Sequence, residues 1–289
     1  MCNTLKIGRL RYSRFDSDGW KGWVCEGFEK EFEEIGTLLS ENSRNAVVDA
    51  LCRRVAKHER PGGNYYSKLM WAQNDGALQK KELFSLLKWA LGPARSVTIL
   101  KNTSKMLEKG HLCPKPLLGI RQRKGNGHHL NLIVTTEVTA PTIEDVIQKR
   151  SEGEAELAVR QAGGDLARLH ADHFLHGDYL PRNACFSEQG TVFLDNDKTS
   201  WWPIMPPWWL RRRNLEQFVY NLMLQKGLEE CHLELPTIFW EAYANEAKVA
   251  ENRRESIFDG IVAKCRKRWE NKVKRERKVK GMQENEADN

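Results

Sequence analysis

Three oxygen-bearing side chains in the second half of the chain have the types and spacing that phosphoryl transfer requires. Asp178 follows His176 and Gly177, Asn183 comes five residues later, and Asp195 closes a short apolar run. Transfer of a phosphoryl group to a hydroxyl needs a carboxylate beside the attacking oxygen and oxygen ligands for Mg²⁺. Two carboxylates and a carboxamide could supply both, provided that the chain brings them together.

Each of these residues has a role that its chemistry allows. Asp178 would orient the acceptor hydroxyl and accept its proton, while Asn183 and Asp195 would bind Mg²⁺. His176 is expected to hydrogen-bond beneath the loop rather than to carry a proton. Asp197 could be a second metal or substrate contact or could fix the loop, and the sequence leaves these alternatives open.

The elements around the candidate site follow from apolar periodicity. A helix is predicted over 154–172, because its apolar residues recur at helical spacing, and it leads the chain into His176. Two short strands, 184–186 and 191–194, flank a turn at 187–190. The three oxygen side chains can meet only if this turn closes.

Lys68 is the candidate for contact with nucleotide phosphates. A turn signal at 60–64 precedes an aromatic-rich strand over 65–71, and the lysine lies inside that strand. A lysine held by a sheet can reach the phosphates along the cleft, whereas the alternative is an ordinary solvent-facing residue of an alternating strand. The residues downstream favour the phosphate contact.

The rest of the chain predicts strands followed by helices. A strand is predicted over 20–24 and helical spacing over 29–39, whereas 45–57 could form strands or one helix. Further predictions are helices over 78–91 and 94–109 and a buried strand over 130–138. The segment 136–140, which includes Glu137, would then be a hinge whose backbone could pair with an adenine, or simply a strand leaving a sheet.

These elements predict an α+β fold with two lobes. Residues 1–137 would form a sheet-rich lobe with an N-terminal extension, residues 138–282 a helical lobe with the catalytic loop, and residues 283–289 a disordered tail.

Composition narrows the class of protein. The chain has 289 residues, of which 29% are charged and 40% hydrophobic, as expected for a soluble globular protein. It contains no apolar run that could span a membrane, and its start does not have the pattern of a secretory signal. Its seven cysteines are scattered, which predicts reduced thiols in a cytosolic setting. The net charge of +7 favours anionic partners, although much of the excess lies in 253–280.

The segment 201–209 combines four tryptophans with three prolines, and Arg211, Arg212 and Arg213 follow it. Tryptophan beside arginine suits a bilayer interface or a sugar platform. Internal packing against the following helix explains the pattern equally well.

The pattern His-x-Asp-x4-Asn, followed by a strand that ends in Asp, resembles the catalytic loop and metal-binding Asp of kinases. More narrowly, HGDYLPRN at 176–183 and VFLDNDK at 192–198 look like the corresponding stretches of the bacterial lipopolysaccharide kinase family. YYSK at 65–68, LGPAR at 91–95 and TTE at 135–137 add to the likeness, which covers roughly residues 45–225.

The resemblance implies a protein-kinase-like two-lobed fold and a kinase that uses ATP and Mg²⁺. It further implies transfer of the γ-phosphate to a sugar hydroxyl of a glycolipid, with Kdo or heptose of the lipopolysaccharide inner core as the acceptor. The expected location is the cytoplasm, with peripheral contact at the cytoplasmic face of the inner membrane. Nucleic acid is disfavoured as a partner, and the oligomeric state is left open.

The sequence departs from the kinase pattern in its first half. No Gly-rich loop precedes Lys68, and no acidic residue lies in 97–105 to pair with it, so that Glu82 and Glu108 are the candidates. In the second half, Gly177 replaces the arginine of protein kinases, no Ala-Pro-Glu is present, and only a short segment follows Asp197. A peptide platform is therefore disfavoured. The alternatives are an aminoglycoside-phosphotransferase-like or atypical protein kinase, and a non-catalytic pseudokinase that acts as a binding module.

Overall fold

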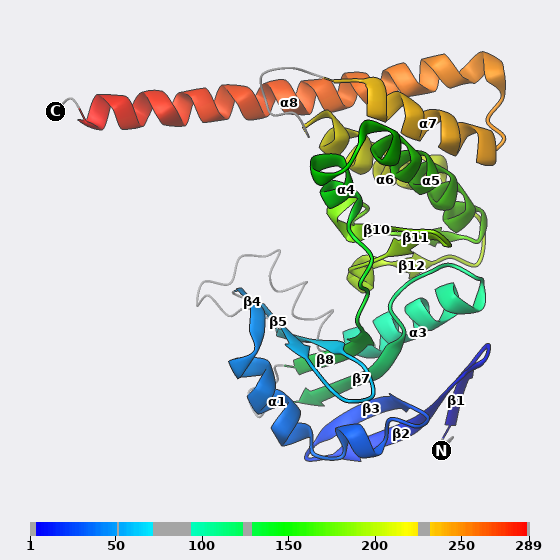
Figure 1. Cartoon of the computed structure of the whole chain (residues 1–289), viewed down its shortest axis with the longest axis vertical. Helices are drawn as coiled ribbons and strands as arrows, with labels where there is room; N and C mark the ends of the chain where they lie inside the picture. Colours follow the sequence, from blue (N-terminus) through cyan, green and yellow to red (C-terminus); the bar gives the residue numbers. More distant parts are fainter. Residues whose placement is uncertain (1–3, 51, 72–93, 124–128, 225–231, 288–289) are drawn as a thin grey trace. The chain divides into compact units, whose positions relative to one another are not determined.

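The structure is a computed structural model that describes residues 4–50, 52–71, 94–123, 129–224 and 232–287, with side chains up to residue 275. The predicted helix over 78–91 and the candidate Glu82 lie outside these residues. The chain separates into two compact units, 1–139 and 140–289, which we call the sheet unit and the helical unit (Figure 1).

The sheet unit is built on an antiparallel sheet in which eight strands are described, in the order β1-β2-β3-β7-β8-β6-β5-β4. Two helices and a 3-10 turn, η1, complete the described part of this unit. The strands are β1 (Thr4–Ile7), β2 (Leu10–Ser17), β3 (Trp20–Cys25), β4 (Ala46–Ala50), β5 (Arg53–His58), β6 (Tyr65–Trp71), β7 (Pro116–Arg123) and β8 (His129–Thr136), and the other elements are η1 (Lys30–Phe32), α1 (Ile35–Arg44) and α3 (Arg95–Glu108).

Both faces of the sheet are covered. Because side chains alternate along a strand, β8 sends Leu132 and Val134 to the face covered by η1 and α1, where they pack with Phe32. Ile133 points to the other face and packs with α3 through Ile99. The sheet therefore has a core on each side.

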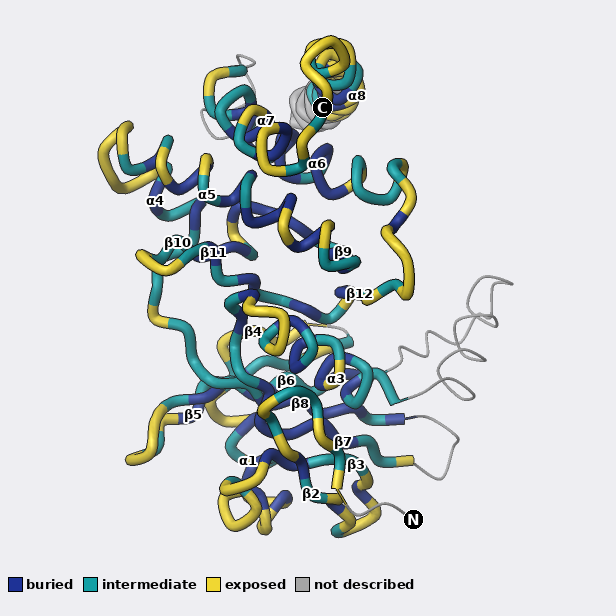
Figure 2. The backbone as a smooth tube through the Cα atoms, turned by 90° about the vertical axis from the view of Figure 1, so that its right-hand side faces the viewer, coloured by how far each residue is buried: buried dark blue, intermediate teal, exposed yellow. Residues whose placement is uncertain are grey.

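The helical unit contains five described helices, two short strand pairs and two 3-10 turns. Its helices α5, α6 and α7 lie side by side, and the hairpin β10–β11 lies beneath α5 (Figures 1 and 2). The elements are α4 (Ile143–Lys149), α5 (Glu152–Ala171), β9 (Phe174–Leu175), η2 (Pro181–Asn183), β10 (Ala184–Ser187), β11 (Gly190–Phe193), η3 (Asn196–Lys198), β12 (Ser200–Trp201), α6 (Trp208–Met223), α7 (Glu234–Glu246) and α8 (Glu251–Ala287).

The packing of α5 on α7 depends on a glycine. A Cβ at Gly163 would lie 2.3 Å from the carbonyl oxygen of Phe239, so a larger residue would separate the helices. The ring of Phe239 stacks on Phe218 of α6 at 4.5 Å, which joins the third helix to the same core.

The predicted α+β fold, sheet-rich in its first part and helical in its second, is confirmed. The ambiguous segment 45–57 forms the two strands β4 and β5, and the hairpin β10–β11 forms where its turn was predicted. The sequence did not reveal β1, β2 or α7. Helix α8 includes residues 283–287, for which the sequence predicted a disordered tail.

Candidate active site

The loop that carries Asp178 is tied by hydrogen bonds to the strand end that carries Asp195. His176 Nε2 lies 2.8 Å from the carbonyl oxygen of Leu194, the residue before Asp195. Leu194 N–H donates to the carbonyl oxygen of Asn183 at 2.8 Å. Asn183 Nδ2 in turn donates to the carbonyl oxygen of Asp178 at 2.9 Å. These bonds gather the three predicted site residues into one small region.

The imidazole of His176 is a structural donor. Its ring is fully buried, and burial lowers its pKa, while the negative charges of Asp195 and Asp178 oppose that shift. A neutral ring that faces a carbonyl oxygen through Nε2 must carry its proton there, which leaves Nδ1 without a hydrogen-bond partner among the described residues. His176 therefore supports the loop, and the carboxylates of Asp178 and Asp195 lie close enough to influence its pKa.

Asp195 has a left-handed backbone conformation, with φ +49° and ψ +52°. Non-glycine residues rarely adopt this conformation, although Asp tolerates it better than most. It breaks the direction of β11 so that the chain turns at once into η3. Such local strain is typical of residues whose side chains are aimed at a functional site.

The turn η3 is held against the candidate loop without room for a side chain at Gly177. Asn196 Nδ2 donates to the carbonyl oxygen of Phe193 at 2.9 Å, which fixes the turn. A Cβ on Gly177 would lie 2.3 Å from Lys198 Cβ and 2.6 Å from the Lys198 carbonyl oxygen. The arginine that protein kinases carry at this position could not fit here, so the glycine is a packing requirement of this chain.

Tyr179 anchors the loop in the helical core. Its ring is fully buried and stacks on Phe218 of α6 at 4.8 Å, and its hydroxyl donates to the carbonyl oxygen of Ala162 on α5 at 3.0 Å. Burial raises the pKa of its hydroxyl well above the usual value, so the hydroxyl remains a donor. Asp178 is thus preceded by a tightly packed glycine and followed by a buried anchor.

A buried polar network holds the start of the loop. Asn214 of α6 accepts through Oδ1 from the backbone N–H of His176 at 3.3 Å and from His170 Nε2 at 3.1 Å. The other ring nitrogen of His170 lies 3.0 Å from the hydroxyl of Tyr243 on α7. Burial lowers the pKa of His170 to about 3, so the ring is neutral, donates through Nε2 and accepts through Nδ1.

This network was not among the sequence-based predictions, although the chain contains a signal for it. His170 continues the apolar stripe of α5 four residues after Leu166, and Asn214 shares the apolar stripe of α6 with Phe218. A polar residue on such a stripe must find a buried partner. Two of them on helices that flank the candidate loop would have indicated a supporting network.

The hairpin β10–β11 is fixed to its surroundings on two sides. Asp165 of α5 accepts from the backbone N–H of Thr191 at 2.7 Å, and Gln161 Nε2 donates to the carbonyl oxygen of Ser187 at 3.1 Å. On the other side, Phe186 N–H donates to the carbonyl oxygen of Pro141 at 2.9 Å. The turn that the sequence required to close is therefore closed and held.

The donor set suits a hard divalent cation. Asn183 and Asp195 are both partly exposed and present oxygen atoms, and the Asn183 amide uses its nitrogen toward Asp178, which directs Oδ1 elsewhere. Mg²⁺ is held in proteins by one or two carboxylates together with substrate phosphates rather than by a full cage. Among the described residues, no group of three or more His, Cys, Asp or Glu side chains that could hold a metal ion occurs.

Lys68 lies in the middle of β6, in the sheet unit. It pairs with Val55 of β5 and Ile133 of β8, and cross-strand partners share a face. Because Ile133 packs against α3, Lys68 lies on the face that α3 covers. Glu108, one candidate partner, is at the far end of α3, where its side chain packs against Gly8 of the β1–β2 turn.

The strand of Lys68 is pinned through the adjacent residue on the opposite face. Ser67 is fully buried, and its Oγ lies 2.7 Å from His58 Nε2 and 2.6 Å from Asn42 Nδ2 of α1. His58 Nδ1 in turn contacts Glu41 at 3.1 Å, and Glu41 pairs with Arg60. This network fixes the position of β6 in the sheet.

Glu137, the other predicted nucleotide contact, uses its side chain within the sheet unit. Its carboxylate accepts from Asn64 Nδ2 at 2.7 Å and pairs with Lys57 at 3.0 Å, which together lower its pKa. Its backbone N–H donates to the carbonyl oxygen of Asn64 at 3.0 Å. The carboxylate thus ties the end of β8 to the β5–β6 turn.

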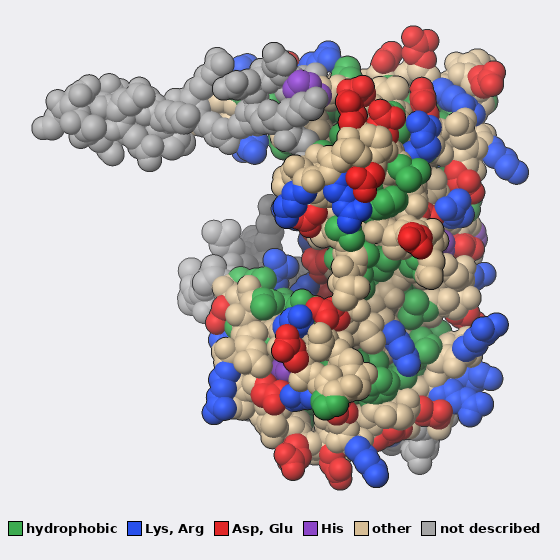
Figure 3. Space-filling view, in the orientation of Figure 1, with side chains coloured by type: hydrophobic (Ala, Val, Ile, Leu, Met, Phe, Trp, Pro, Cys, Tyr) green, Lys and Arg blue, Asp and Glu red, His purple; other side chains and the backbone are tan. Residues whose placement is uncertain are grey.

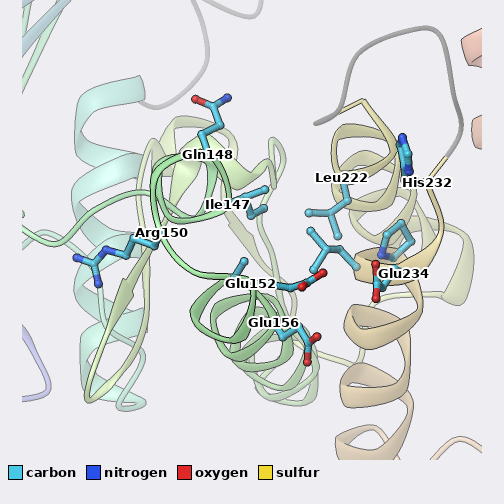
Figure 4. A pocket seen from close by; sticks show the side chains of 11 residues that line it. Ile147, Gln148, Arg150, Glu152, Glu156, Leu222, His232 and Glu234 are labelled. Atoms are coloured by element: carbon cyan, nitrogen blue, oxygen red, sulfur yellow. The ribbon is translucent and has the colours of Figure 1, made fainter.

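A cavity of about 450 Å³ lies elsewhere in the helical unit, between α4 and α5 on one side and α6 and α7 on the other (Figure 4). Its lining includes Glu152, Glu156 and Glu234, and none of the predicted site residues. The candidate active site is therefore distinct from this acidic cavity. On the face shown in Figure 3, basic and acidic side chains are interspersed over both units, with no extended area of one sign.

An antiparallel sheet unit with a central lysine, followed by a helical unit with this loop and hairpin, defines a protein-kinase-like fold. More specifically the fold is WaaP-like: the solved structure "WaaP in complex with acyl carrier protein" matches with a TM-score of 0.52 and 14% identity. The match covers 85% of this chain and 96% of that one. In all, 1144 chains of solved structures match, so the architecture is shared widely and does not define a substrate. No protein-family model and no curated protein matches the sequence.

Proposed function

We propose that this chain is an ATP- and Mg²⁺-dependent kinase that transfers the γ-phosphate to a sugar hydroxyl of a glycolipid, with Kdo or heptose of the lipopolysaccharide inner core as the acceptor. The hydrogen-bond chain that joins Asp178, Asn183 and the strand end at Asp195 is the observation that carries the proposal. The fold of the neighbouring WaaP structure supports the same class of enzyme. In this proposal residues 1–137 cover the nucleotide and residues 138–282 carry the catalytic loop.

The roles of the residues in the helical unit follow from their chemistry. Asp178 orients the acceptor hydroxyl and accepts its proton, because it is the carboxylate of the buttressed loop. Asn183 Oδ1 and the Asp195 carboxylate hold Mg²⁺, which when bound neutralises charge on the nucleotide phosphates. His176 and Asn214 keep the loop in place and take no part in proton transfer.

The sheet unit supplies the nucleotide contacts. Lys68 holds the phosphates, and the hairpin β4–β5 takes the place of a Gly-rich loop because it immediately precedes the lysine strand β6 in the chain. The N–H groups of Thr136 and Glu137 are already bonded to Lys115 and Asn64. An adenine is therefore held by the backbone just after Glu137, and the Glu137 carboxylate positions that segment.

A phosphotransfer assay tests the proposal. Purified protein is incubated with γ-labelled ATP, Mg²⁺ and, in parallel, lipopolysaccharide core, an aminoglycoside or a mixture of proteins. We expect label in the core glycolipid and a loss of about 10³-fold in Asp178→Ala, the magnitude typical for a missing general base. Glu188→Ala is the matched control, because this carboxylate is exposed in the β10–β11 turn.

The outcomes separate the competing functions. Label on an aminoglycoside or a protein, again dependent on Asp178, would indicate an aminoglycoside-phosphotransferase-like or atypical protein kinase. Equal labelling by the Asp178→Ala variant would contradict the catalytic assignment. Absence of Mg-ATP binding in a thermal-shift titration would favour a pseudokinase that acts only as a binding module.

The partner named with the neighbouring structure is also worth testing. WaaP was solved in complex with acyl carrier protein, and we propose the same class of partner for this chain. Copurification of acyl carrier protein with the expressed full-length chain, identified by mass spectrometry, would support this, and its absence at stoichiometric levels would count against it.

A further inference from the structure

The large apolar side chains exposed in the described residues are concentrated in one segment. Seven such side chains are exposed, and four of them lie within 201–209. Ile204 is 71% exposed and Trp209 is 69% exposed, whereas Pro206 is buried and fixes the segment to the unit. Figure 2 shows this exposed stretch between β12 and α6. Isolated exposed apolar residues need no explanation, but four in nine residues do.

A basic cavity adjoins the same segment. It has a volume of about 410 Å³ and is lined by Trp208, Arg211, Tyr243, Lys248 and Arg253 among others, with no acidic residue in the lining. Trp208 belongs to the first turn of α6 together with the exposed Trp209, so the apolar segment and the cavity are continuous.

Arg211 is one of the basic residues that line this cavity. Its guanidinium lies over the ring of Trp208, with 5.5 Å to the ring centroid. Its Nε is buried and has no hydrogen-bond partner among the described residues. A buried guanidinium donor beside two further cations is suited to an anionic oxygen, and no carboxylate of the lining supplies one.

The two features together fit one kind of partner. Tryptophan, isoleucine and methionine side chains insert into the boundary between headgroups and acyl chains, and lysine and arginine beside them attract anionic headgroups. No helix among the described residues is both long and apolar enough to cross a bilayer. Contact through this surface would therefore be peripheral.

We propose that 201–209 and the cavity of Arg211, Lys248 and Arg253 form a docking surface for a bilayer that contains anionic phospholipid. The apolar side chains enter the interface, and a headgroup phosphate occupies the basic cavity. This goes beyond the proposed kinase function and does not require it, because docking needs neither nucleotide nor catalysis.

Vesicle flotation of the full-length chain without nucleotide tests the proposal. Vesicles of phosphatidylcholine with phosphatidylglycerol should bind the protein, and vesicles of phosphatidylcholine alone should bind it much more weakly. Ile204→Ser with Trp209→Ser should weaken binding by about 10-fold or more, since each side chain loses its apolar transfer energy. Lys248→Ala with Arg253→Ala should weaken it by roughly 5-fold per charge and reduce its salt dependence.

Matched controls lie on α5 of the same unit. Leu157 is exposed and apolar and Arg160 is exposed and basic, so Leu157→Ser and Arg160→Ala should leave binding unchanged. Thermal melting of each variant checks that the unit still folds.

Two results would overturn the proposal. One is binding to anionic vesicles that the patch variants retain in full, which would assign it to the basic helix α8 instead. The other is absence of vesicle binding even at low salt. If free glycerol phosphate still binds in that case, the basic cavity is a site for a soluble phosphate and not for a bilayer. An Asp178→Ala protein that is inactive but still floats would support docking and leave the kinase assignment to its own assay.

Discussion

Each unit buries a histidine network that positions a predicted site residue, and the two networks differ in charge. In the helical unit, His170, Asn214 and Tyr243 form a network of uncharged groups that ends on the backbone of the candidate loop. The nearby Arg211 guanidinium acts to lower the pKa of both His170 and Tyr243. In the sheet unit, His58 supports the strand of Lys68 but leads outward to the ion pair of Glu41 with Arg60. The loop of Asp178 is thus held by hydrogen-bonding groups that are themselves uncharged, and the strand of Lys68 by groups that include a partly exposed ion pair.

The two regions also differ in how their residues come together. Asp178, Asn183 and Asp195 lie close in the sequence and are joined by a single loop and hairpin. Lys68 and Glu137 lie far apart in sequence and are placed by the register of an eight-stranded sheet. A site formed by one short loop and hairpin tolerates little change in the spacing of its residues. In a site assembled on a sheet, a contact can instead be supplied by a residue of a different strand or turn. This is consistent with a candidate catalytic motif that matches the kinase pattern and with a proposed nucleotide-binding side that lacks a Gly-rich loop.

The largest effect on kcat is expected at the two proposed metal ligands, where one variant removes a metal ligand and the other removes a hydrogen bond that closes the loop. Asp195→Asn removes a charged ligand but tolerates the left-handed backbone, so we expect a loss of about 10² to 10³-fold in kcat and a higher Mg²⁺ requirement. Asn183→Asp keeps an oxygen for the metal but removes the donor to the Asp178 carbonyl, and should cost about 10-fold. Initial rates across a Mg²⁺ titration measure both. Equal losses, with no change in the Mg²⁺ dependence, would argue against separate roles.

A second prediction concerns the tight contact at Gly177. Gly177→Ala places a Cβ against Lys198 and should lower the free energy of unfolding by about 2 kcal/mol, together with activity. Gly153→Ala in α5 is the matched control, because no atom lies within 4 Å of its Cβ position. It should be neutral or stabilise by up to about 1 kcal/mol. Urea denaturation compares the two, and a stable, active Gly177→Ala protein would refute the close packing.

The sheet unit offers a paired test of the nucleotide contact. Lys68→Ala should raise KM for ATP by about 10 to 100-fold, the range for losing a charge-assisted hydrogen bond to phosphate. Lys57→Ala, on the neighbouring strand, removes the ion pairs with Glu137 and Glu59, while Glu137 keeps its hydrogen bond from Asn64, and should change KM little. Steady-state kinetics with varied ATP distinguishes the two lysines. A larger effect at Lys57 would reverse the assignment.

The sequence predicted the loop and hairpin around Asp178 well because their signals are local. The spacing from Asp178 to Asn183 and the hairpin that ends at Asp195 needed only turn chemistry and apolar alternation to be recognised. The polar residues His170 and Asn214 on apolar helix stripes indicate that buried partners exist, but the partners themselves could not be named, because His170 and Tyr243 meet through helix packing, which no local pattern specifies. Gly177 was seen as a departure from protein kinases, but its cause, the backbone of Lys198, is a tertiary contact.

The sheet unit was predicted less completely for the same reason. The strand of Lys68 was clear from its preceding turn. Strand β1 escaped notice because it has only four residues, and β2 because polar and charged residues interrupt its alternation. The segment 45–57 was ambiguous since short apolar runs fit either a helix or strands, and pairing with β6 decided it. The partners of Lys68 depend on which residues of the neighbouring strands and helices lie on its face of the sheet. Those residues can be identified only once the strand register is known.

The last prediction uses pH to compare the two histidine networks. The folded-state pKa of His170 is about 3, below the ordinary 6.5, so the unfolded chain binds an extra proton between these values. The stability that the neutral ring contributes is complete above about pH 6.5 and is lost as the pH falls toward 3. At pH 5 the loss should be about 2 kcal/mol, and His170→Gln should remove it. His58→Gln is the comparison, because burial lowers the pKa of His58 but Glu41 opposes that shift. Its effect on the acid dependence should therefore be smaller, and urea denaturation at pH 7 and pH 5 would show the difference. A steeper change for His58→Gln would mean that the sheet unit, not the helical unit, contains the acid-sensitive network.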